Sequence, residues 1–580
     1  MRLIITLLAL VALLPAADVA PSTVTLSNGV AEVELSNIQG RIKSFRLPGV
    51  KPIEYYGWHA EQLKTQGVRL PDPVRPLAVL DEFNPQGGGH NLLYFVGLPK
   101  IADSQAWTVV RTGDRQASFR WQEGETGPSW TLSYELPEGK TEIVSTLVIN
   151  NSSASDLDLQ PTIIPVNGIH QDDPAADSYY VTVGRHYGGT ATNGIENLGL
   201  PEPEKEILVS PENLDYVVLK SRFFAALFAP GSCHITGGAV IPPSAPVVAS
   251  TAPVVTPAGV ATSAAPKAVT AVGAGNVLHI SAVGYALPAA LGGTKQAYLK
   301  AGYTAQGGKI VLKPGQTLTM NWRLTAAALD TTGLARLEVI ERKAEFTEAY
   351  YRFFRILSDV CTWLLGHVAW IVRNYGVAIL LLTFLIKLAL HRTTFKQQES
   401  MMKMQKLQPE LKLLQETYKS DKQKLAAKQM ELWKKNGVNP LGGCLPILIQ
   451  IPIFTALYMS FSHSADMRGH GFLWIKDLTL PDAVWGWVLP WSLPLLGNIL
   501  TLNPLPIIYI GVTVWMSLSQ KLPTGGDPAQ EQTMKMMRWM PVVFGFIFYS
   551  MPSGLVLYFT ANAVLSTIEI KMVKKKLGIA

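Results

Sequence analysis

Long apolar runs dominate the chain after Tyr350, whereas the preceding part alternates polar and apolar residues. A helix needs about 20 mostly apolar residues to cross a bilayer, and only structures that satisfy their own backbone hydrogen bonds do so. We expect five spans, over 375–390, 441–461, 504–518, 539–550 and 554–573. The sequence therefore predicts a polytopic α-helical membrane bundle within 375–576.

A lysine interrupts the first apolar run. Lys387 directly follows 379–386, which is apolar except for Thr383. A lysine at the centre of a membrane helix costs about 2.5–3.5 kcal/mol, so its ammonium group needs water, a partner or the lipid headgroups. Two interpretations stay open. Lys387 reaches the headgroups near His391 and Arg392, or it faces a polar cavity together with Thr383, which lies four residues earlier on the same helical face.

Other polar residues lie within or beside the later spans: Gln450, Thr455, Ser460, Ser517, Ser519, Asn562 and Ser566. Singly, each needs no more than an interhelical hydrogen bond worth about 0.6 kcal/mol. Together with a buried cation they indicate a polar cavity. Glu569 lies near the basic end of the last span, so we expect a cavity with one cation and no acid. Such a cavity suits transient binding of polar or acidic peptide better than proton relay.

Positive charge is confined to two short segments that flank apolar runs. Residues 391–440 carry eleven Lys and Arg against five Asp and Glu, and the tail contains Lys571, Lys574, Lys575 and Lys576. The net charge of the whole chain is +7, so the remainder is slightly acidic. Basic segments beside spans are typical of cytoplasmic loops, not of a nucleic-acid surface. We therefore expect the C-terminus in the cytoplasm.

One further apolar segment, 484–502, is a candidate for a sixth membrane span. It contains Pro490, Pro494, Gly497 and three tryptophans. A sixth crossing here would place the basic tail on the exported side, against the charge rule. We therefore interpret it as a re-entrant or interfacial segment in the periplasm.

A charged helical hairpin is expected between the first two spans, over 393–437. Its first arm carries apolar residues spaced 3 and 4 apart, typical of one seam of a helix pair: Met404, Leu407, Leu411, Leu414 and Tyr418. Pro409 kinks this arm or restarts the helix. Ser420 and Asp421 form the turn and cap the second arm. Leu425, Leu432 and Trp433 on that arm can meet the first.

The residue pattern of 22–340 predicts antiparallel β-structure. Leu318, Met320, Trp322 and Leu324 alternate with polar residues, as half-buried strands do. This pattern predicts a large all-β sandwich. Residues 240–275 are mostly Ala, Val, Pro, Ser and Thr and indicate a flexible insertion. Residues 1–21 contain a short apolar stretch that is a cleaved signal or a short anchor, and both export the region that follows.

Residues 341–374 are helical by period and mix apolar with charged side chains. Arg352, Arg355, Asp359 and Arg373 interrupt the apolar face. An amphipathic helix lying along the membrane surface explains this mixture better than a span does.

Two motifs in the apolar region resemble a known family. Residues 438–446, Val-Asn-Pro-Leu-Gly-Gly-Cys-Leu-Pro, followed by Ile-Gln-Ile-Pro-Ile-Phe at 449–454, resemble the third-helix signature of the YidC-type membrane protein insertases. Residues 552–558, Pro-Ser-Gly-Leu-Val-Leu-Tyr, resemble their last-helix signature. The resemblance covers about 345–576. The β-rich region is similar in size and place to the family's periplasmic β-supersandwich.

The resemblance implies a hydrophilic, positively charged groove that passes apolar segments of new proteins into the bilayer without a cofactor, metal or catalytic residue. The family's groove arginine corresponds to Lys387, which keeps the charge but lacks the bidentate fork. A family tyrosine in the last helix corresponds to Phe559. The expected groove residues are Lys387, Thr383, Gln450, Tyr558, Phe559 and Asn562.

The resemblance also implies partners and a location. The partners are nascent membrane proteins, the lipid bilayer, the Sec translocon, and the ribosome or targeting factors that the hairpin would contact, with no direct binding of nucleic acid. The location is the bacterial inner membrane, with the β-rich domain in the periplasm.

Two other classes of function were weighed. A transporter or channel predicts internal repeats and paired acidic residues in spans, and the sequence contains neither. A membrane-tethered carbohydrate enzyme would use residues such as His170, Asp172, Asp173 and His186, which fit a solvated loop better. Fold alone does not confer function.

Overall fold

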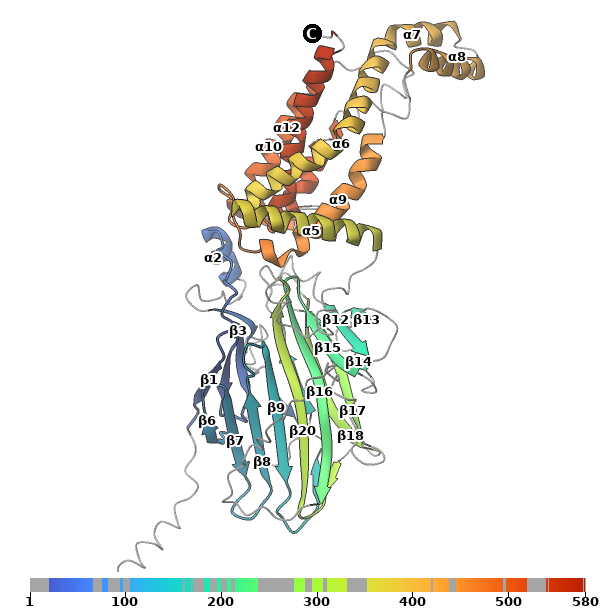
Figure 1. Cartoon of the computed structure of the whole chain (residues 1–580). Coiled ribbons are helices and arrows are strands. Elements are labelled where there is room, and N and C mark those ends of the chain that lie inside the picture. Colours follow the sequence, from blue (N-terminus) through green and yellow to red (C-terminus); the bar gives the residue numbers. More distant parts are fainter. Residues whose placement is uncertain are drawn as a thin grey trace, which may run out of the picture. The chain divides into compact units, whose positions relative to one another are not determined.

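In the computed structural model, the chain forms two compact units (Figure 1). The first comprises Met1–Pro52 and Lys64–Glu348, and the second comprises Ile53–Leu63 and Ala349–Ala580. The structure describes residues 20–65, 76–81, 94–96, 105–159, 162–167, 169, 182–187, 196–199, 206–209, 214–237, 276–286, 295–305, 310–330, 352–418, 421–437, 445–493, 497–518, 539–540, 542–576 and 578.

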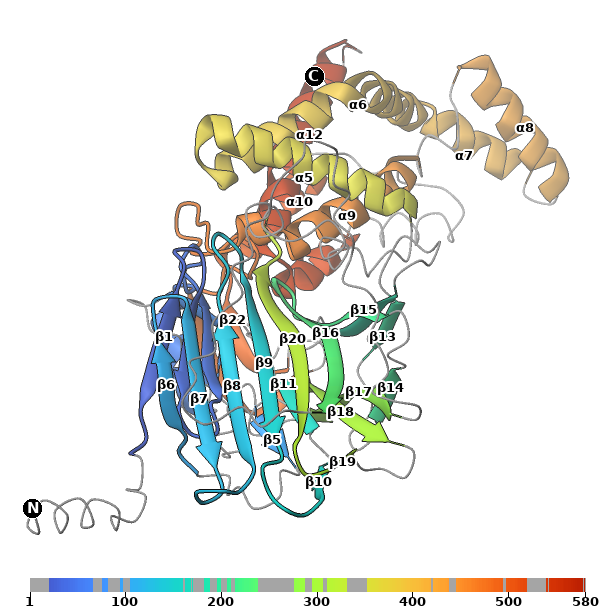
Figure 2. The same cartoon turned by 60° about the horizontal axis from the view of Figure 1, so that its bottom comes forward.

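The first unit is an all-β, sandwich-like assembly of antiparallel strands (Figure 2). Its largest described sheet has nine strands in the order β13 (Glu196–Gly199), β12 (Thr182–Tyr187), β15 (Leu214–Lys220), β16 (Phe224–Gly237), β20 (Gln316–Ala328), β9 (Glu142–Asn150), β8 (Ser129–Glu135), β7 (Gln116–Gln122) and β6 (Thr108–Thr112). A five-stranded sheet has the order β14 (Glu206–Val209), β17 (Asn276–Ala286), β18 (Lys295–Ala305), β11 (Thr162–Asn167) and β5 (Tyr94–Val96). Smaller sheets contain β1 (Thr23–Ser27), β2 (Glu32–Ser36), β3 (Ile42–Leu47) and β4 (Leu77–Asp81), and the pair β10 (Leu157–Leu159) and β19 (Ile310–Leu312).

The predicted alternation along β20 is confirmed. Leu318, Met320, Trp322 and Leu324 are all buried, and the residues between them are half-buried. β20 lies between β16 and β9, and the ladders continue for most of its length. Burying every second side chain against the facing strands is what gives this central strand its period of two. The insertion at 240–275 and the sequence 1–19 lie outside the described residues.

The second unit is helical. Its described helices are α5 (Arg352–Val372), α6 (Tyr375–Lys406), α7 (Gln408–Thr417), α8 (Lys422–Lys435), α9 (Leu445–His463), α10 (Pro504–Leu518) and α12 (Ser553–Lys576), with short turns η5 (Ala465–Met467) and η6 (Phe548–Ser550). Residues 542–547 are helical and lead into η6. Tyr375–Ser400 and Ser553–Lys576 are long and apolar enough to cross a membrane, whereas Ile356–Val372 and α10 are shorter apolar helices.

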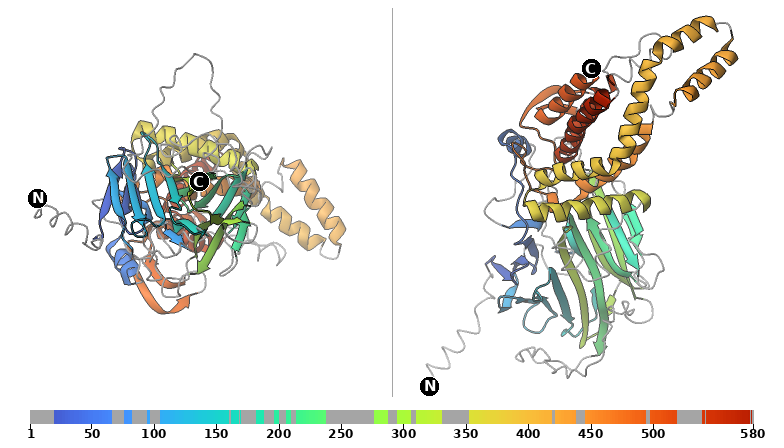
Figure 3. Two further views of the ribbon diagram at one scale, coloured as in Figure 1. Left: turned by 90° about the horizontal axis from the view of Figure 1, so that it is seen from below. Right: turned by 45° about the horizontal axis from the view of Figure 1, so that its top comes forward.

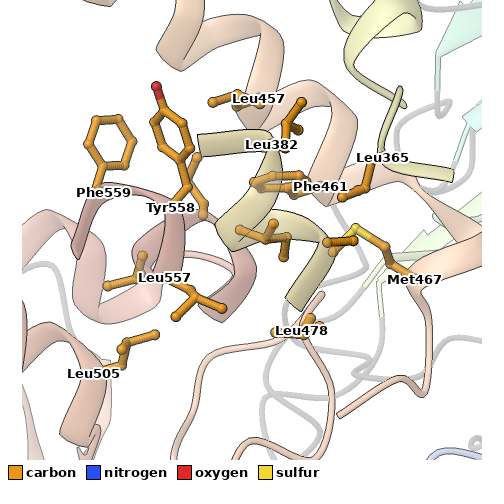
Figure 4. Packing of buried hydrophobic residues seen from close by; sticks show 14 of the residues in the cluster. Leu365, Leu382, Leu457, Phe461, Met467, Leu478, Leu505, Leu557, Tyr558 and Phe559 are labelled. Atoms are coloured by element: carbon orange, nitrogen blue, oxygen red, sulfur yellow. The ribbon is translucent and has the colours of Figure 1, made fainter. Parts of the chain in front are cut away.

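The helices share one apolar core, shown in Figure 4. Leu365 of α5, Leu382 of α6 and Leu457 of α9 pack with Leu557 and Tyr558 of α12. The predicted region of apolar helices is therefore confirmed, while the number of crossings stays a prediction.

Helices α6 and α12 run parallel to one another. A Cβ placed on Gly554, near the start of α12, would lie 3.2 Å from Ile379 Cδ1, near the start of α6. Further along, Glu399 pairs with Lys576, both close to the ends of the candidate spans. The two helices therefore begin at one end of the bundle and finish at the other.

The apolar segment 484–502 forms a β-hairpin of β21 (Trp485–Leu493) and β22 (Gly497–Leu502). Residues 53–63 lie against this part of the second unit and include the start of α2 (Gly57–Thr65). Trp58 Nε1 donates a hydrogen bond to the carbonyl of Ala483 at 3.0 Å. The sequence did not predict this strand pairing, and the expectation of a re-entrant or interfacial segment in the periplasm stays a prediction.

The charged segment after α6 contains two short helices, α7 and α8 (Figure 3). Leu407 and Leu411 form a small core with Leu432 and Trp433. Pro409 lies in the first turn of α7, so the proline restarts the helix rather than kinking it. The Asp421 carboxylate accepts a hydrogen bond from the Lys424 amide at 3.0 Å, which is the predicted cap of α8.

Candidate functional site

A cavity of about 410 Å³ lies within the second unit, bounded by α6, α9, α10, α12 and the helical stretch around 540–548. Most of its wall is apolar, and it includes Ile386, Leu390, Ile453, Phe454, Tyr509, Met516, Phe544, Phe548 and Phe559. Its polar side chains come mainly from α6 and α12 and include Lys387, Thr394, Gln397, Asn562 and Ser566. The cavity therefore combines a large apolar surface with a set of polar groups, as ligand sites usually do.

Five of the six expected groove residues line this cavity: Lys387, Gln450, Tyr558, Phe559 and Asn562. They come from three helices that are far apart in sequence. Thr383 does not line it. Its side chain is buried, and its hydroxyl donates to the Ile379 carbonyl one turn earlier at 2.7 Å. The structure therefore places Thr383 within the core of α6 rather than on the cavity wall.

The Lys387 side chain points toward α12. Its ammonium Nζ lies 2.8 Å from Glu569 Oε2 and donates to Ser566 Oγ at 2.9 Å. The lysine side chain is 14% exposed and that of Glu569 only 6%. Lys387 therefore has an acid partner where none was expected, although Glu569 is not among the residues that line the cavity. Glu569 is near the basic end of α12, but the parallel packing of α6 and α12 brings it level with Lys387.

The other carboxylate oxygen of Glu569 has different partners. Oε1 lies 2.9 Å from His391 Nδ1 and accepts a hydrogen bond from Thr394 Oγ1 at 2.9 Å. Lys387, His391 and Thr394 are spaced 4 and 3 apart and thus form one stripe of α6. The sequence signal for the site was a lysine inside an apolar run, and nothing in the sequence identified Thr394 or the acid as its neighbours.

An aromatic cluster forms the apolar side of the cavity. The Phe548 ring lies 4.9 Å from the Phe559 ring and 5.0 Å from the Tyr509 ring, measured between centroids. Phe454 lies 5.6 Å from Phe559. Phe559, which stands where the family has a tyrosine, therefore packs into this cluster and adds no hydroxyl to the cavity.

Gln450 brings an amide to the cavity wall from α9. It is half-buried, and its side chain interacts with the Tyr558 hydroxyl on α12. The cavity therefore has a polar group on α9 in addition to those on α6 and α12.

The expected hairpin residues have mixed placements. Leu407 and Leu411 are buried, Leu414 is half-buried, and the side chain of Met404 lies outside the described residues. Of the residues weighed for sugar chemistry, His170, Asp172 and Asp173 lie outside the described residues, as does the side chain of His186. Among the described residues, no group of three His, Cys, Asp or Glu could hold a metal ion.

The second unit is a domain of apolar helices, two of them long enough to cross a membrane, with an ion pair beside an apolar cavity. Residues 367–578 match the family described as the 60Kd inner membrane protein. The membrane protein insertase YidC of Francisella tularensis subsp. novicida (strain U112) is 43% identical over 218 residues, which are 37% of this chain and 35% of that protein. The same values hold for the membrane protein insertase YidC of Francisella tularensis subsp. tularensis (strain SCHU S4 / Schu 4).

This carboxy-terminal region is therefore similar to the 60Kd inner membrane protein family and to membrane protein insertases named YidC. The aligned stretch spans about a third of the length of those relatives.

Some solved structures are similar to about half of the chain. A putative aldose 1-epimerase from Escherichia coli K12 has 12% identity and a TM-score of 0.30, and it covers 53% of this chain and 100% of its own. A galactose mutarotase related enzyme from Lactobacillus acidophilus has 11% identity and a TM-score of 0.31, and covers 53% of this chain and 97% of its own. Similarity of this degree supports no conclusion about this chain.

Proposed function

We propose that the protein is a membrane protein insertase and folding chaperone. The observation that carries this proposal is the charged group on the wall of an apolar cavity, in the region that matches the insertase family. An apolar segment that leaves water for lipid gains about 25 cal/mol per Å² of buried apolar surface. The barrier to that transfer is the polar exported flank of the segment, because polar groups are costly to bring into hydrocarbon.

The cavity lowers this barrier because it offers polar partners to the exported flank part of the way across the bilayer. Lys387 lies twelve residues after the start of α6, about 18 Å along the helix axis. A polar or acidic flank that enters the cavity meets the ammonium of Lys387 and the amide of Gln450. Meanwhile, the apolar part of the substrate slides along the aromatic wall toward lipid. No nucleotide is needed in this scheme, because the transfer of the apolar segment supplies the free energy.

The parallel packing of α6 and α12 supports a single orientation for both. Lys403 and Lys406 lie in the last turn of α6, and Lys574, Lys575 and Lys576 in that of α12. Basic helix ends are retained on the cytoplasmic side. On this basis the C-terminus is cytoplasmic, the chain crosses the membrane five times, and the β-hairpin and the β-rich unit lie on the periplasmic side.

The α7–α8 pair is the proposed contact for incoming chains. It follows the basic end of α6 and exposes apolar side chains, with Leu413 68% and Met430 50% exposed. The partners proposed for it are nascent membrane proteins, ribosomes or targeting factors. Cooperation with the Sec translocon is part of the same proposal.

Insertion by the purified full chain in proteoliposomes tests this function. The substrate is a single-span protein with a short acidic exported segment, and protease protection of that segment measures insertion. Wild-type protein and Lys387→Arg should insert it, because both keep a cation in the cavity, and Lys387→Glu should insert it several-fold more slowly. Insertion by Lys387→Glu at the wild-type rate, or equal insertion into empty liposomes, would refute the proposal.

A further inference from the structure

Glu569 lies beside the Lys387 ammonium group, where an acidic group of a substrate would also bind. Its Oε2 is buried, lies 2.8 Å from Lys387 Nζ and has no hydrogen-bond donor in good geometry among the described residues. Lys387 and Ser566 both line the cavity. The carboxylate is therefore the ionic partner of the same ammonium group that an acidic substrate segment would seek.

The ammonium group of Lys387 has more donors than the partners that the structure describes for it. An ammonium group has three N–H donors. Ser566 Oγ takes one at 2.9 Å, and the Glu569 carboxylate takes the charge contact. A substrate carboxylate can therefore approach the ammonium before the contact with Glu569 is broken.

The two carboxylate oxygens of Glu569 contact different partners, so one contact can break while the others persist. Oε1 is held by His391 and by Thr394, both on α6. If Lys387 turns to another carboxylate, Glu569 keeps these two partners and is not left as an unpaired buried charge. Such a charge would be costly, because breaking a buried pair by losing one partner costs about 3–5 kcal/mol.

We propose that Glu569 is the resident counter-ion of Lys387 and sets which exported segments the cavity accepts. In the empty cavity, Glu569 neutralises Lys387, and an acidic segment must compete with it, whereas a neutral segment need not. His391 and Thr394 retain Glu569 during this exchange. The inference rests on the proposed insertase function and names a specificity-determining residue for it.

Glu399 is another carboxylate that joins α6 to α12, and it has its own cation, because Lys576 Nζ lies 2.8 Å from its Oε2. The Glu399–Lys576 pair also joins α6 to α12, but its side chains are 20% and 56% exposed and neither lines the cavity. It therefore supplies a matched control, an ion pair between the same two helices without access to the substrate.

The test compares two single-span substrates that differ only in the exported segment, one with two aspartates and one with two asparagines. Purified full-length variants are reconstituted in proteoliposomes, and the ratio of the acidic to the neutral insertion rate is measured. Glu569→Gln should raise this ratio by about threefold or more, because it frees the charge of Lys387. Glu399→Gln should leave the ratio at the wild-type value.

A second variant keeps the inference testable if Glu569→Gln does not fold. Thr394→Val removes one of the two Oε1 partners, so Glu569 depends more on Lys387, and the acidic-to-neutral ratio should fall below the wild-type value. An unchanged ratio in both variants, even with slower insertion of both substrates, would mean that Glu569 only stabilises the bundle and would overturn the inference. Failure of the wild-type protein to insert either substrate above empty liposomes would overturn the proposed function itself, and this inference with it.

Discussion

Lys387 Nζ on α6 lies 2.8 Å from Glu569 Oε2 on α12, and both side chains are largely buried. This ion pair answers the question that the sequence left open about Lys387. The ammonium group points into the bundle toward α12 and Ser566, not along α6 toward the headgroups. The cost of a lysine within an apolar helix is offset by a carboxylate that parallel packing places at the same height.

Removing one member of the Lys387–Glu569 pair should lower stability more than replacing both members does. Lys387→Met leaves Glu569 buried with His391 and Thr394 as its remaining partners, so we expect the free energy of unfolding to fall, but by less than the roughly 3–5 kcal/mol that a buried charge without partners costs. Adding Glu569→Leu removes the remaining buried charge and should restore most of this loss. Thermal unfolding of the purified protein in detergent measures both effects. A double variant no more stable than Lys387→Met would contradict the assignment of a buried pair.

Two glycines provide a matched test of packing around the cavity. A Cβ on Gly545 would lie 2.2 Å from Ile510 Cγ1 on α10, whereas Gly511, the next residue to Ile510, has nothing within 4 Å. Gly545→Ala should lower stability by about 1–3 kcal/mol through overpacking. Gly511→Ala should be neutral or stabilising by up to about 1 kcal/mol, because alanine favours the helix. Melting temperatures that change equally in both variants would argue against this close approach.

Asp482 should give a pH-dependent contribution to stability. Burial raises the pKa of its carboxyl above the ordinary value of 3.8, although hydrogen bonds from the Leu505 amide and the Trp474 indole oppose this. The folded state therefore binds the Asp482 proton more tightly than the unfolded state. Its contribution to stability is greatest at acid pH and declines as the pH rises from about 3.8 through the raised pKa.

Asp482→Asn isolates that contribution. Asparagine keeps an oxygen for the two donors and cannot ionise, so the stability of wild-type protein relative to this variant should fall with rising pH. Asp482→Ala leaves both donors without an acceptor and should cost about 1–3 kcal/mol for each at every pH. Unfolding in detergent across pH 3.5 to 7 checks both. A wild-type stability that rises relative to Asp482→Asn would show that the pKa is lowered.

The α7–α8 pair should be separable from the bundle. Phe395 and Met402 pack against Ile570 and Val573 of α12, so a deletion must begin after them. Replacing 408–435 with a short Gly-Ser linker should leave the melting temperature unchanged and slow insertion. Asp421→Ala, which removes the cap of α8 at a cost of about 1 kcal/mol, should increase hydrogen exchange in that helix alone, while Asp421→Asn should not. Full insertion activity of the deletion variant would make the pair a spacer.

The sequence predicted those features that depend on local order. The alternation from Leu318 to Leu324 identified a central strand, and Asp421 identified the start of α8, because both signals lie within a few residues. The aromatic side of the cavity was predicted only in part, since Phe559 was expected in a hydrophilic groove and it packs against Phe548 and Phe454.

Features that depend on which groups pair with one another, rather than on composition or spacing, were missed. Glu569 looked like part of a basic helix end, because its partner on α6 is remote in sequence and the parallel register of two helices cannot be read from either one. The segment 484–502 has the composition of a membrane helix, yet its two halves pair as strands. Thr383 shares the helical face of Lys387, but its hydroxyl bonds to its own backbone.

Site-specific photo-crosslinking tests the central claim, that an inserting segment occupies this cavity. A photoreactive amino acid replaces Phe544 or Phe559, both on the cavity wall, or Trp370 on α5, which is 81% exposed and does not line the cavity. Each variant is then presented with a ribosome-bound nascent chain arrested during insertion. We predict crosslinks to the nascent apolar segment from Phe544 and Phe559 and none above background from Trp370. Crosslinks from Trp370 alone, or equally from all three positions, would contradict the account.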